Sequence, residues 1–159
     1  MSKYGIATVF KHSEPGYEFT PNNIPLHLTH VDSFELDQNA EQLAEKLSSA
    51  LADQKSFHVK ALADAQYGPD KNKLVTELEL TPSLSKFHAM IMDLLSLEGA
   101  VLKNPQFHGE GYCPHISVYG TRRIAIGELI TISQVSIASK VSNTEDANTK
   151  ILATINFKV

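Results

Sequence analysis

Two short stretches of the sequence decide the fold prediction: PLHLTH at residues 25–30 and GYCPHISVYG at residues 111–120. In the first, Thr29 follows His27 by two residues, and in the second Ser117 follows His115 by the same spacing. Side chains two residues apart share one face of a strand, so each stretch presents an imidazole beside a hydroxyl. The apolar residue between them points to the opposite face. We therefore predict that both stretches are strands with one face in the core.

The segments around these stretches predict an α+β fold. Apolar residues recur at helical spacing over residues 40–53, after a capping box formed by Asn39 and Gln42. A second helix is predicted from Thr81, its cap, to the stop at Gly99. The predicted strands cover residues 4–10, 25–34, 57–61, 74–80, 112–119, 129–138 and 151–159. One histidine-bearing strand in each half suggests an internal duplication, and the long connections favour antiparallel pairing over a doubly wound parallel sheet.

The composition predicts a single cytoplasmic domain. A chain of 159 residues, of which 42% are hydrophobic, suits one domain over residues 1–159. Cys113 is the only cysteine, which excludes an internal disulfide, and no stretch reads as a signal peptide or a membrane span. The net charge of -4 argues against binding to bulk double-stranded nucleic acid. A small substrate with one or two phosphates remains compatible with this charge.

Two facing pairs of histidine and hydroxyl would form a site for phosphoryl transfer. One imidazole would remove a proton from the attacking group, while the other would donate a proton to the leaving oxygen. The hydroxyls of Thr29 and Ser117 would bind the phosphate oxygens. The seven histidines lack the cysteine or carboxylate spacing of a zinc site, so we predict neither metal nor cofactor. The pattern alone is equally compatible with two unrelated strand histidines.

Four further residues are candidates for substrate contact, and each has an ordinary structural alternative. Tyr119 shares a face with Ser117, and could line a cleft or simply pack there. His108 lies in a glycine-flanked segment that could contact a base or sugar, or be a plain loop. Tyr4 could stack on a base or belong to the core. Arg122, in the only adjacent arginine pair, could attract a phosphate or lie in a solvated turn.

The two motifs together resemble those of the two-histidine (2H) phosphoesterases. Each motif of that superfamily is His, any residue, Thr or Ser, and then an apolar residue. Val118 fills the last position of the second motif, whereas His30 fills it in the first and departs from the pattern. The resemblance is closest to the bacterial and phage 2′-5′ RNA ligase-like, or RNA 2′,3′-cyclic phosphodiesterase, branch. It implies a bilobal, pseudosymmetric fold with two mostly antiparallel sheets, helices packed outside and a central cleft.

The resemblance also implies roles for individual residues. His27 and His115 would be catalytic, and Thr29 and Ser117 would bind phosphate. The implied reaction is cleavage of a 2′,3′-cyclic phosphate or a 2′-5′ linkage, or ligation, with a small nucleotide or an RNA end as partner. One alternative is the hydrolysis of cyclic nucleotide messengers, as in phage relatives that counter host defence. Another is a catalytically silent nucleotide-binding module, although the chain keeps all four motif residues.

Overall fold

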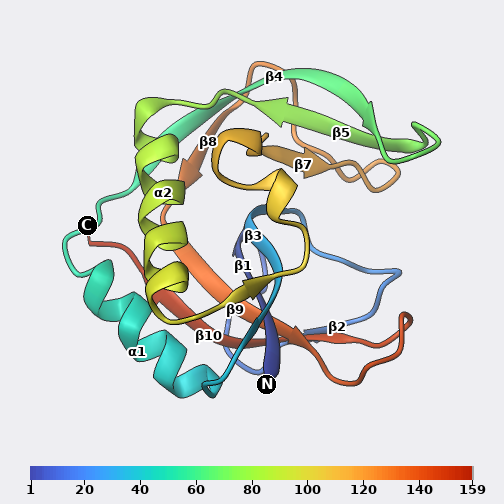
Figure 1. Cartoon of the computed structure of the whole chain (residues 1–159). Coiled ribbons are helices and arrows are strands. Elements are labelled where there is room, and N and C mark those ends of the chain that lie inside the picture. Colours follow the sequence, from blue (N-terminus) through green and yellow to red (C-terminus); the bar gives the residue numbers. More distant parts are fainter. Residues whose placement is uncertain (159) are drawn as a thin grey trace.

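The computed structural model describes residues 1–158, which form two sheets, two α-helices and two short 3₁₀ turns (Figure 1). The strands of the first half are β1 (Ser2–Val9), β2 (Glu18–Phe19), β3 (His27–Leu36), β4 (Phe57–Tyr67) and β5 (Lys73–Leu78). Those of the second half are β6 (Val101–Leu102), β7 (His115–Ser117), β8 (Leu129–Ile132), β9 (Gln134–Lys140) and β10 (Thr149–Asn156). The helices are α1 (Ala40–Ala50) and α2 (Pro82–Leu97), and the 3₁₀ turns are η1 (Pro105–Phe107) and η2 (Gly109–Gly111).

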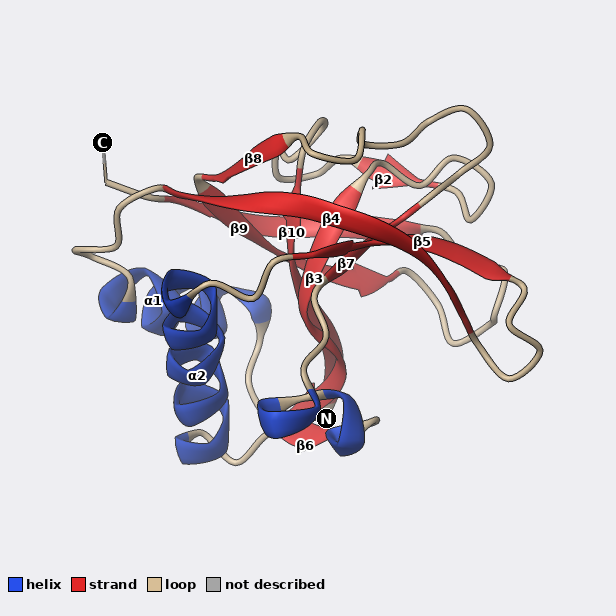
Figure 2. Cartoon of the chain, turned by 90° about the horizontal axis from the view of Figure 1, so that it is seen from above, coloured by secondary structure: helices blue, strands red, loops and turns tan. Residues whose placement is uncertain are grey.

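The strands pair antiparallel in two sheets, which confirms the predicted α+β class. The larger sheet has the order β2-β10-β9-β1-β3-β6, and the smaller has the order β7-β5-β4-β8. Each sheet therefore contains one histidine motif, at the start of β3 and along β7. The two strands contact each other where the sheets meet, as both views of the chain show (Figures 1 and 2).

Both helices begin where their caps predict. The Asn39 side chain accepts a hydrogen bond from the Gln42 amide at 2.8 Å, and the Gln42 side chain accepts one from the Asn39 amide at 2.9 Å. The Thr81 hydroxyl accepts from the Leu84 amide at 3.1 Å, which starts α2 at Pro82. The helices lie beside each other on one side of the molecule (Figure 2), where α1 packs on β10 and α2 on β4. No helix in residues 1–158 has both the length and the apolar character needed to cross a membrane.

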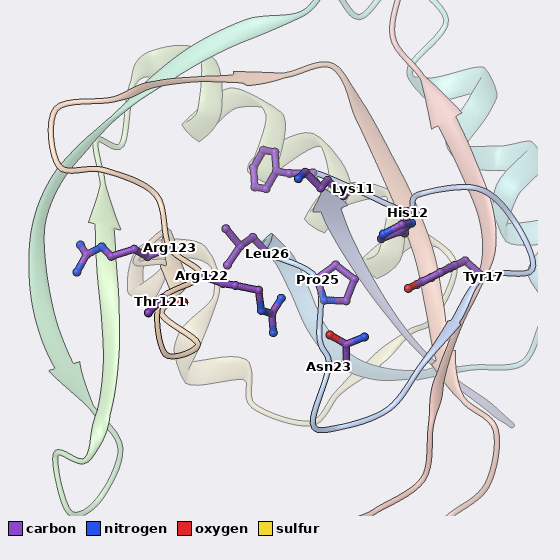
Figure 3. A pocket seen from close by; sticks show the side chains of 10 residues that line it. Lys11, His12, Tyr17, Asn23, Pro25, Leu26, Thr121, Arg122 and Arg123 are labelled. Atoms are coloured by element: carbon purple, nitrogen blue, oxygen red, sulfur yellow. The ribbon is translucent and has the colours of Figure 1, made fainter.

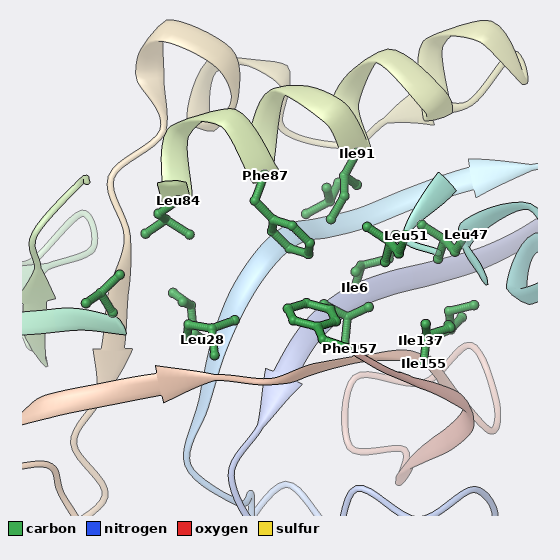
Figure 4. Packing of buried hydrophobic residues seen from close by; sticks show 14 of the residues in the cluster. Ile6, Leu28, Leu47, Leu51, Leu84, Phe87, Ile91, Ile137, Ile155 and Phe157 are labelled. Atoms are coloured by element: carbon green, nitrogen blue, oxygen red, sulfur yellow. The ribbon is translucent and has the colours of Figure 1, made fainter. Parts of the chain in front are cut away.

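One hydrophobic cluster joins the two sheets and the two helices (Figure 4). Phe87 of α2 lies at its centre, with its ring centroid 5.7 Å from that of Phe57 and 5.3 Å from that of Phe157. Leu28 and Ile116, the residues between each histidine and hydroxyl, are both buried in this cluster. Their burial fixes the orientation of the two motifs, because it turns the alternate side chains of β3 and β7 away from the core.

The second histidine strand is shorter than the predicted 112–119. It begins at His115 because Pro114 has no N–H to donate, although its carbonyl accepts from Leu78 at 2.9 Å. After Ser117 the chain turns back, and Tyr119 pairs with Arg122 around Gly120, whose φ of 65° is in the left-handed region.

The predicted strand 129–138 is in fact two strands that belong to different sheets. β8 pairs with β4, whereas β9 pairs with β1 and β10, so the chain passes between the sheets at Ser133. The last predicted strand, 151–159, corresponds to β10, and Val159 lies outside the described residues.

Candidate active site

The two motif histidines are held in the same way. His27 Nδ1 lies 2.9 Å from the carbonyl oxygen of Pro25, and His115 Nδ1 lies 2.9 Å from that of Cys113. A carbonyl only accepts, so Nδ1 carries the proton in both rings and donates it. In each neutral imidazole Nε2 is then the unprotonated nitrogen. Each motif therefore presents an Nε2 atom that can accept or, when protonated, donate a proton.

The histidines lie within electrostatic range of each other. Burial lowers the pKa of His27 most, the hydrogen bond to Pro25 raises it, and the positive charges of Lys73 and His115 lower it. Burial likewise lowers the pKa of His115, the Cys113 carbonyl raises it, Lys73 lowers it and Glu77 raises it. Because the pKa of both imidazoles falls below the ordinary value of 6.5, both are mainly neutral at pH 7.

The two motif hydroxyls lie on the same strands as the histidines: Thr29 on β3 with His27, and Ser117 on β7 with His115. Thr29 is half-buried opposite Ala7 of β1, and its carbonyl accepts a hydrogen bond from the Tyr112 hydroxyl at 3.1 Å. Ser117 is 8% exposed and lies opposite Val75 of β5. Tyr112 precedes the second motif, so its hydroxyl ties the chain entering β7 to the backbone of β3.

Strand β5 adds charged groups that the sequence analysis did not predict. Glu77 lies directly opposite His115 in the β5–β7 register, so the two side chains share one face. The Tyr67 hydroxyl donates to Glu77 Oε2 at 2.5 Å, and the Tyr67 ring meets that of His115 with centroids 4.8 Å apart and planes inclined by 64°. The two short motifs, residues 27–30 and 115–118, carry no acid on the histidine face, and the neighbouring strand supplies one beside His115. The sequence predicts a strand over residues 74–80, but it does not indicate which strand pairs with it, so the position of Glu77 opposite His115 could not be predicted.

Tyr119 and Arg122 lie beside the second motif, as the sequence indicates. The Arg122 guanidinium carbon stands 5.3 Å from the centroid of the Tyr119 ring, and Nη1 donates to the Ile24 carbonyl at 2.8 Å. This bond joins the loop after β7 to the loop before β3. Burial raises the pKa of Tyr119, while the Ser117 hydroxyl and Arg122 lower it, which places the phenol close to the phosphate-binding candidate Ser117.

Comparison with known proteins identifies the family. Residues 12–127 match the model of the 2'-5' RNA ligase superfamily. The chain belongs to this superfamily. The matched range includes both histidine motifs and both loops joined by Arg122. No curated protein matches the chain in sequence.

Solved structures of the same fold cover almost the entire chain. LigT of E. coli complexed with 3'-AMP is 17% identical, with a TM-score of 0.57 and 99% coverage of both chains. LigT complexed with NADP+ is 15% identical, with a TM-score of 0.56 and coverage of 99% and 98%. The protein TT0787 of Thermus thermophilus is 12% identical, with a TM-score of 0.58 and coverage of 98% and 97%. These likenesses establish the LigT-like fold.

Two of the residues considered as substrate contacts, Tyr4 and His108, are buried inside the fold. Tyr4 is 5% exposed, its hydroxyl donates to the Gln38 carbonyl at 2.7 Å, and it pairs with Phe34 toward the far end of β3 from His27. His108 is 8% exposed, with Nε2 donating to Asp32 Oδ1 at 2.8 Å. Each side chain is buried and already has a hydrogen-bond partner inside the fold, so the structure favours the structural alternative for both: Tyr4 belongs to the core and His108 to a packed loop.

His88 fixes the segment that leads into the second motif. Its Nδ1 donates to the His30 carbonyl at 3.1 Å, and its Nε2 accepts from the Gly109 amide at 3.0 Å. The Tyr112 ring stacks on it with centroids 3.8 Å apart and planes inclined by only 5°. Burial lowers the pKa of His88 to about 4, and nearby His108 contributes to this lowering. A neutral His88 therefore holds the turn that places Cys113 and His115.

Cys113 is a free, exposed cysteine next to the second motif. Its sulfur lies 2.8 Å from the Tyr67 hydroxyl and 3.4 Å from Glu77 Oε2. Although the residue is exposed, partial burial of its thiol and the nearby Glu77 carboxylate raise the pKa of Cys113, so a thiolate nucleophile is disfavoured. Within residues 1–158 there is no group of three or more His, Cys, Asp or Glu side chains placed to hold a metal ion.

A pocket of about 450 Å³ opens next to the first motif (Figure 3). Pro25 and Leu26, which directly precede His27, line one part of it. Arg122 lies on one side of the pocket and His12 and Tyr17 lie together on the other, while the Lys11 side chain lies above Leu26 in this view. The pocket therefore has walls from the loop after β1 and from the loop after β7.

Proposed function

We propose that the chain is a metal-independent phosphodiesterase that cleaves 2′,3′-cyclic phosphates or 2′-5′ linkages in RNA or short oligonucleotides. The observation that carries this proposal is the matched pair of anchored imidazoles. One comes from each sheet, each has its Nδ1 bound to a backbone carbonyl, and each is two residues from a hydroxyl. Membership of the superfamily supports the same chemistry.

In the proposed reaction His27 and His115 act as acid and base. Water attacks the phosphorus of the cyclic phosphate while the neutral Nε2 of one histidine accepts its proton. The bond from phosphorus to one ribose oxygen breaks, and the protonated Nε2 of the other histidine supplies the proton to that oxygen. Thr29 and Ser117 donate hydrogen bonds to the non-bridging oxygens, and Lys73 offsets their negative charge. The same site would form a 2′-5′ linkage if a ribose 5′-hydroxyl replaced water as the attacking group.

The first test is a substrate panel run in excess chelator. It contains nucleoside 2′,3′-cyclic phosphates, 2′-5′ dinucleotides, and cyclic di- and trinucleotides, and we expect turnover of one of the first two classes. Turnover of the cyclic messengers alone would favour the alternative substrate, and tight binding without turnover would favour a silent binding module. Loss of activity in chelator with recovery on adding a divalent ion would contradict the proposed mechanism.

The second test removes the proposed catalytic groups. His27→Ala and His115→Ala should each lower kcat by about 10²- to 10⁴-fold, and Thr29→Ala and Ser117→Ala should each cost about 1–3 kcal/mol in kcat/KM. His58→Ala is the matched control, because His58 is also a strand histidine but is exposed on β4. Full activity in either motif variant, with the fold verified by circular dichroism, would refute the assigned roles.

A further inference from the structure

We propose that the pocket beside His27 is a second phosphate subsite, which binds the phosphate of the nucleotide next to the one that reacts. The inference rests on the proposed function, and it narrows the substrate class to oligonucleotides, or nucleotides with at least two phosphates. The four observations that support it concern the position, the charge, the backbone and the shape of the pocket.

The position of the pocket makes it continuous with the reacting site. Pro25 lines the pocket with its side chain and holds the His27 ring through its carbonyl. On the other wall, Arg122 packs over Tyr119, which is two residues beyond Ser117. A chain of nucleotides with one phosphate at the histidines would therefore lead directly into this space.

The charge of the pocket is opposite to that of the protein. The chain carries a net charge of -4, yet no acidic residue lines the pocket and Lys11, Arg122 and Arg123 do. Arg123 is already neutralised by Asp64, with Nη2 2.6 Å from Oδ1 and Nη1 3.0 Å from Oδ2. Figure 3 shows its side chain extending away from Arg122. Lys11 and Arg122 form no ion pair among the described residues, so both cations are available to an anion.

The backbone next to Lys11 is strained in a way that shapes this wall. His12 has a φ of 61°, in the left-handed region that side chains other than glycine rarely adopt. Its ring stacks on that of Tyr17, with centroids 4.5 Å apart and planes inclined by 8°. Strain of this kind persists where the surrounding structure enforces it, often at binding sites. Here it places a flat aromatic pair directly after Lys11 in the chain and across the pocket from Arg122.

The shape and size of the pocket suit a nucleotide. A volume of about 450 Å³ lies in the range of small-molecule sites. Tyr17 and His12 offer a planar surface for a base, and the Asn23 amide at the rim offers both a donor and an acceptor. The ligand class is therefore a nucleotide whose phosphate bridges Lys11 and Arg122, one from each wall.

The test measures binding, so it does not depend on turnover. Isothermal titration at 0.15 M salt would compare adenosine 3′-monophosphate with adenosine 3′,5′-bisphosphate on the full chain. We expect the bisphosphate to bind about tenfold more tightly to the wild-type protein. Lys11→Gln and Arg122→Gln should each reduce this advantage to about twofold, and Arg122→Lys should keep most of it. Lys86→Gln, at an exposed position on α2, is the matched control for charge.

Each outcome bears on one proposal. Equal affinities in the wild type, an advantage that survives in both glutamine variants, or one that is also lost in Lys86→Gln would overturn the second subsite. A bisphosphate advantage that depends on Lys11 and Arg122, with no turnover of any substrate in the panel, would support the subsite and refute the proposed function. Turnover of cyclic phosphates without a bisphosphate advantage would support the proposed function and refute the second subsite.

Discussion

Replacement of Glu77 by glutamine should lower the pKa of His115, because it removes a negative charge that faces the ring. The two residues are directly opposite in the β5–β7 register, so their Cβ atoms are about 5 Å apart and their charges on the order of 6 Å apart. With the screening expected for a solvent-accessible carboxylate, a dielectric constant of about 80 gives an attraction of about 0.7 kcal/mol. The Glu77 carboxylate stabilises the protonated imidazolium and so raises the pKa of His115. Removing its charge should therefore lower that pKa.

The titration is followed best by NMR, through the ring Cε1–H signals of the histidines between pH 4 and pH 9. His27 is an internal reference, since Glu77 is not among the charges that shift its pKa. Glu79→Gln is the matched variant, because Glu79 lies just beyond β5 and is exposed. In a rate profile the limb that reports His115 should move to lower pH by the same amount, while the other limb stays in place.

Three results would refute this reasoning about the electrostatics of the site. One is a His115 titration that does not change in Glu77→Gln, which would mean that the carboxylate does not face the ring in solution. Another is a pKa that rises, which would indicate that loss of the Tyr67–Glu77 contact rearranges the strand. The third is an equal shift in Glu79→Gln, which would assign the effect to the net charge of the chain.

The other predictions concern stability. Phe87→Ala should lower the free energy of unfolding, measured in urea, by about 3–5 kcal/mol, because Phe87 is 1% exposed at the centre of the core. Leu97→Ala, at an exposed position, is the control, and a loss below about 1 kcal/mol in Phe87→Ala, similar to the control, would contradict this packing. Asn39→Ala should cost about 1 kcal/mol through loss of the cap on the Gln42 amide, and an unchanged midpoint would exclude the capping role. Burial lowers the pKa of His88 to about 4, so stability should fall as the pH drops from 6.5 toward 4, where only the unfolded chain is protonated. His88→Phe should flatten that slope, and an unchanged slope would refute this account.

Much of the fold follows from local patterns in the sequence. The caps at Asn39 and Thr81 place the two helices, and Leu28 and Ile116 orient the two motifs, since helix starts and strand faces depend on neighbours within four residues. The pattern over residues 74–80 succeeded only partly. It predicts the strand β5, but not that Val75 and Thr76, on opposite faces of that strand, are both buried, because burial of each face depends on what packs against it.

The interior positions of Tyr4 and His108 did not follow from their neighbours. Both read as possible substrate contacts because each lies near a motif or in a plausible loop. Their partners are Gln38 and Asp32, which are 34 and 76 residues away. Whether an aromatic or a histidine is buried depends on such distant partners, and a single strand or loop carries no information about them.

The sequence by itself determined which chemical groups lie side by side in each motif, and the tertiary structure determined the electrostatic setting of those groups. The residue types and spacing of His27-x-Thr29 and His115-x-Ser117 are local, because residues two apart share a strand face whatever that strand pairs with. The environment of those groups is not local. Glu77 faces His115 through strand pairing, and Arg122 reaches the Ile24 carbonyl across 98 residues of chain. Register and loop contact depend on how the two sheets pack together, so only the folded chain decides which charges surround the two histidines and where a second phosphate could bind.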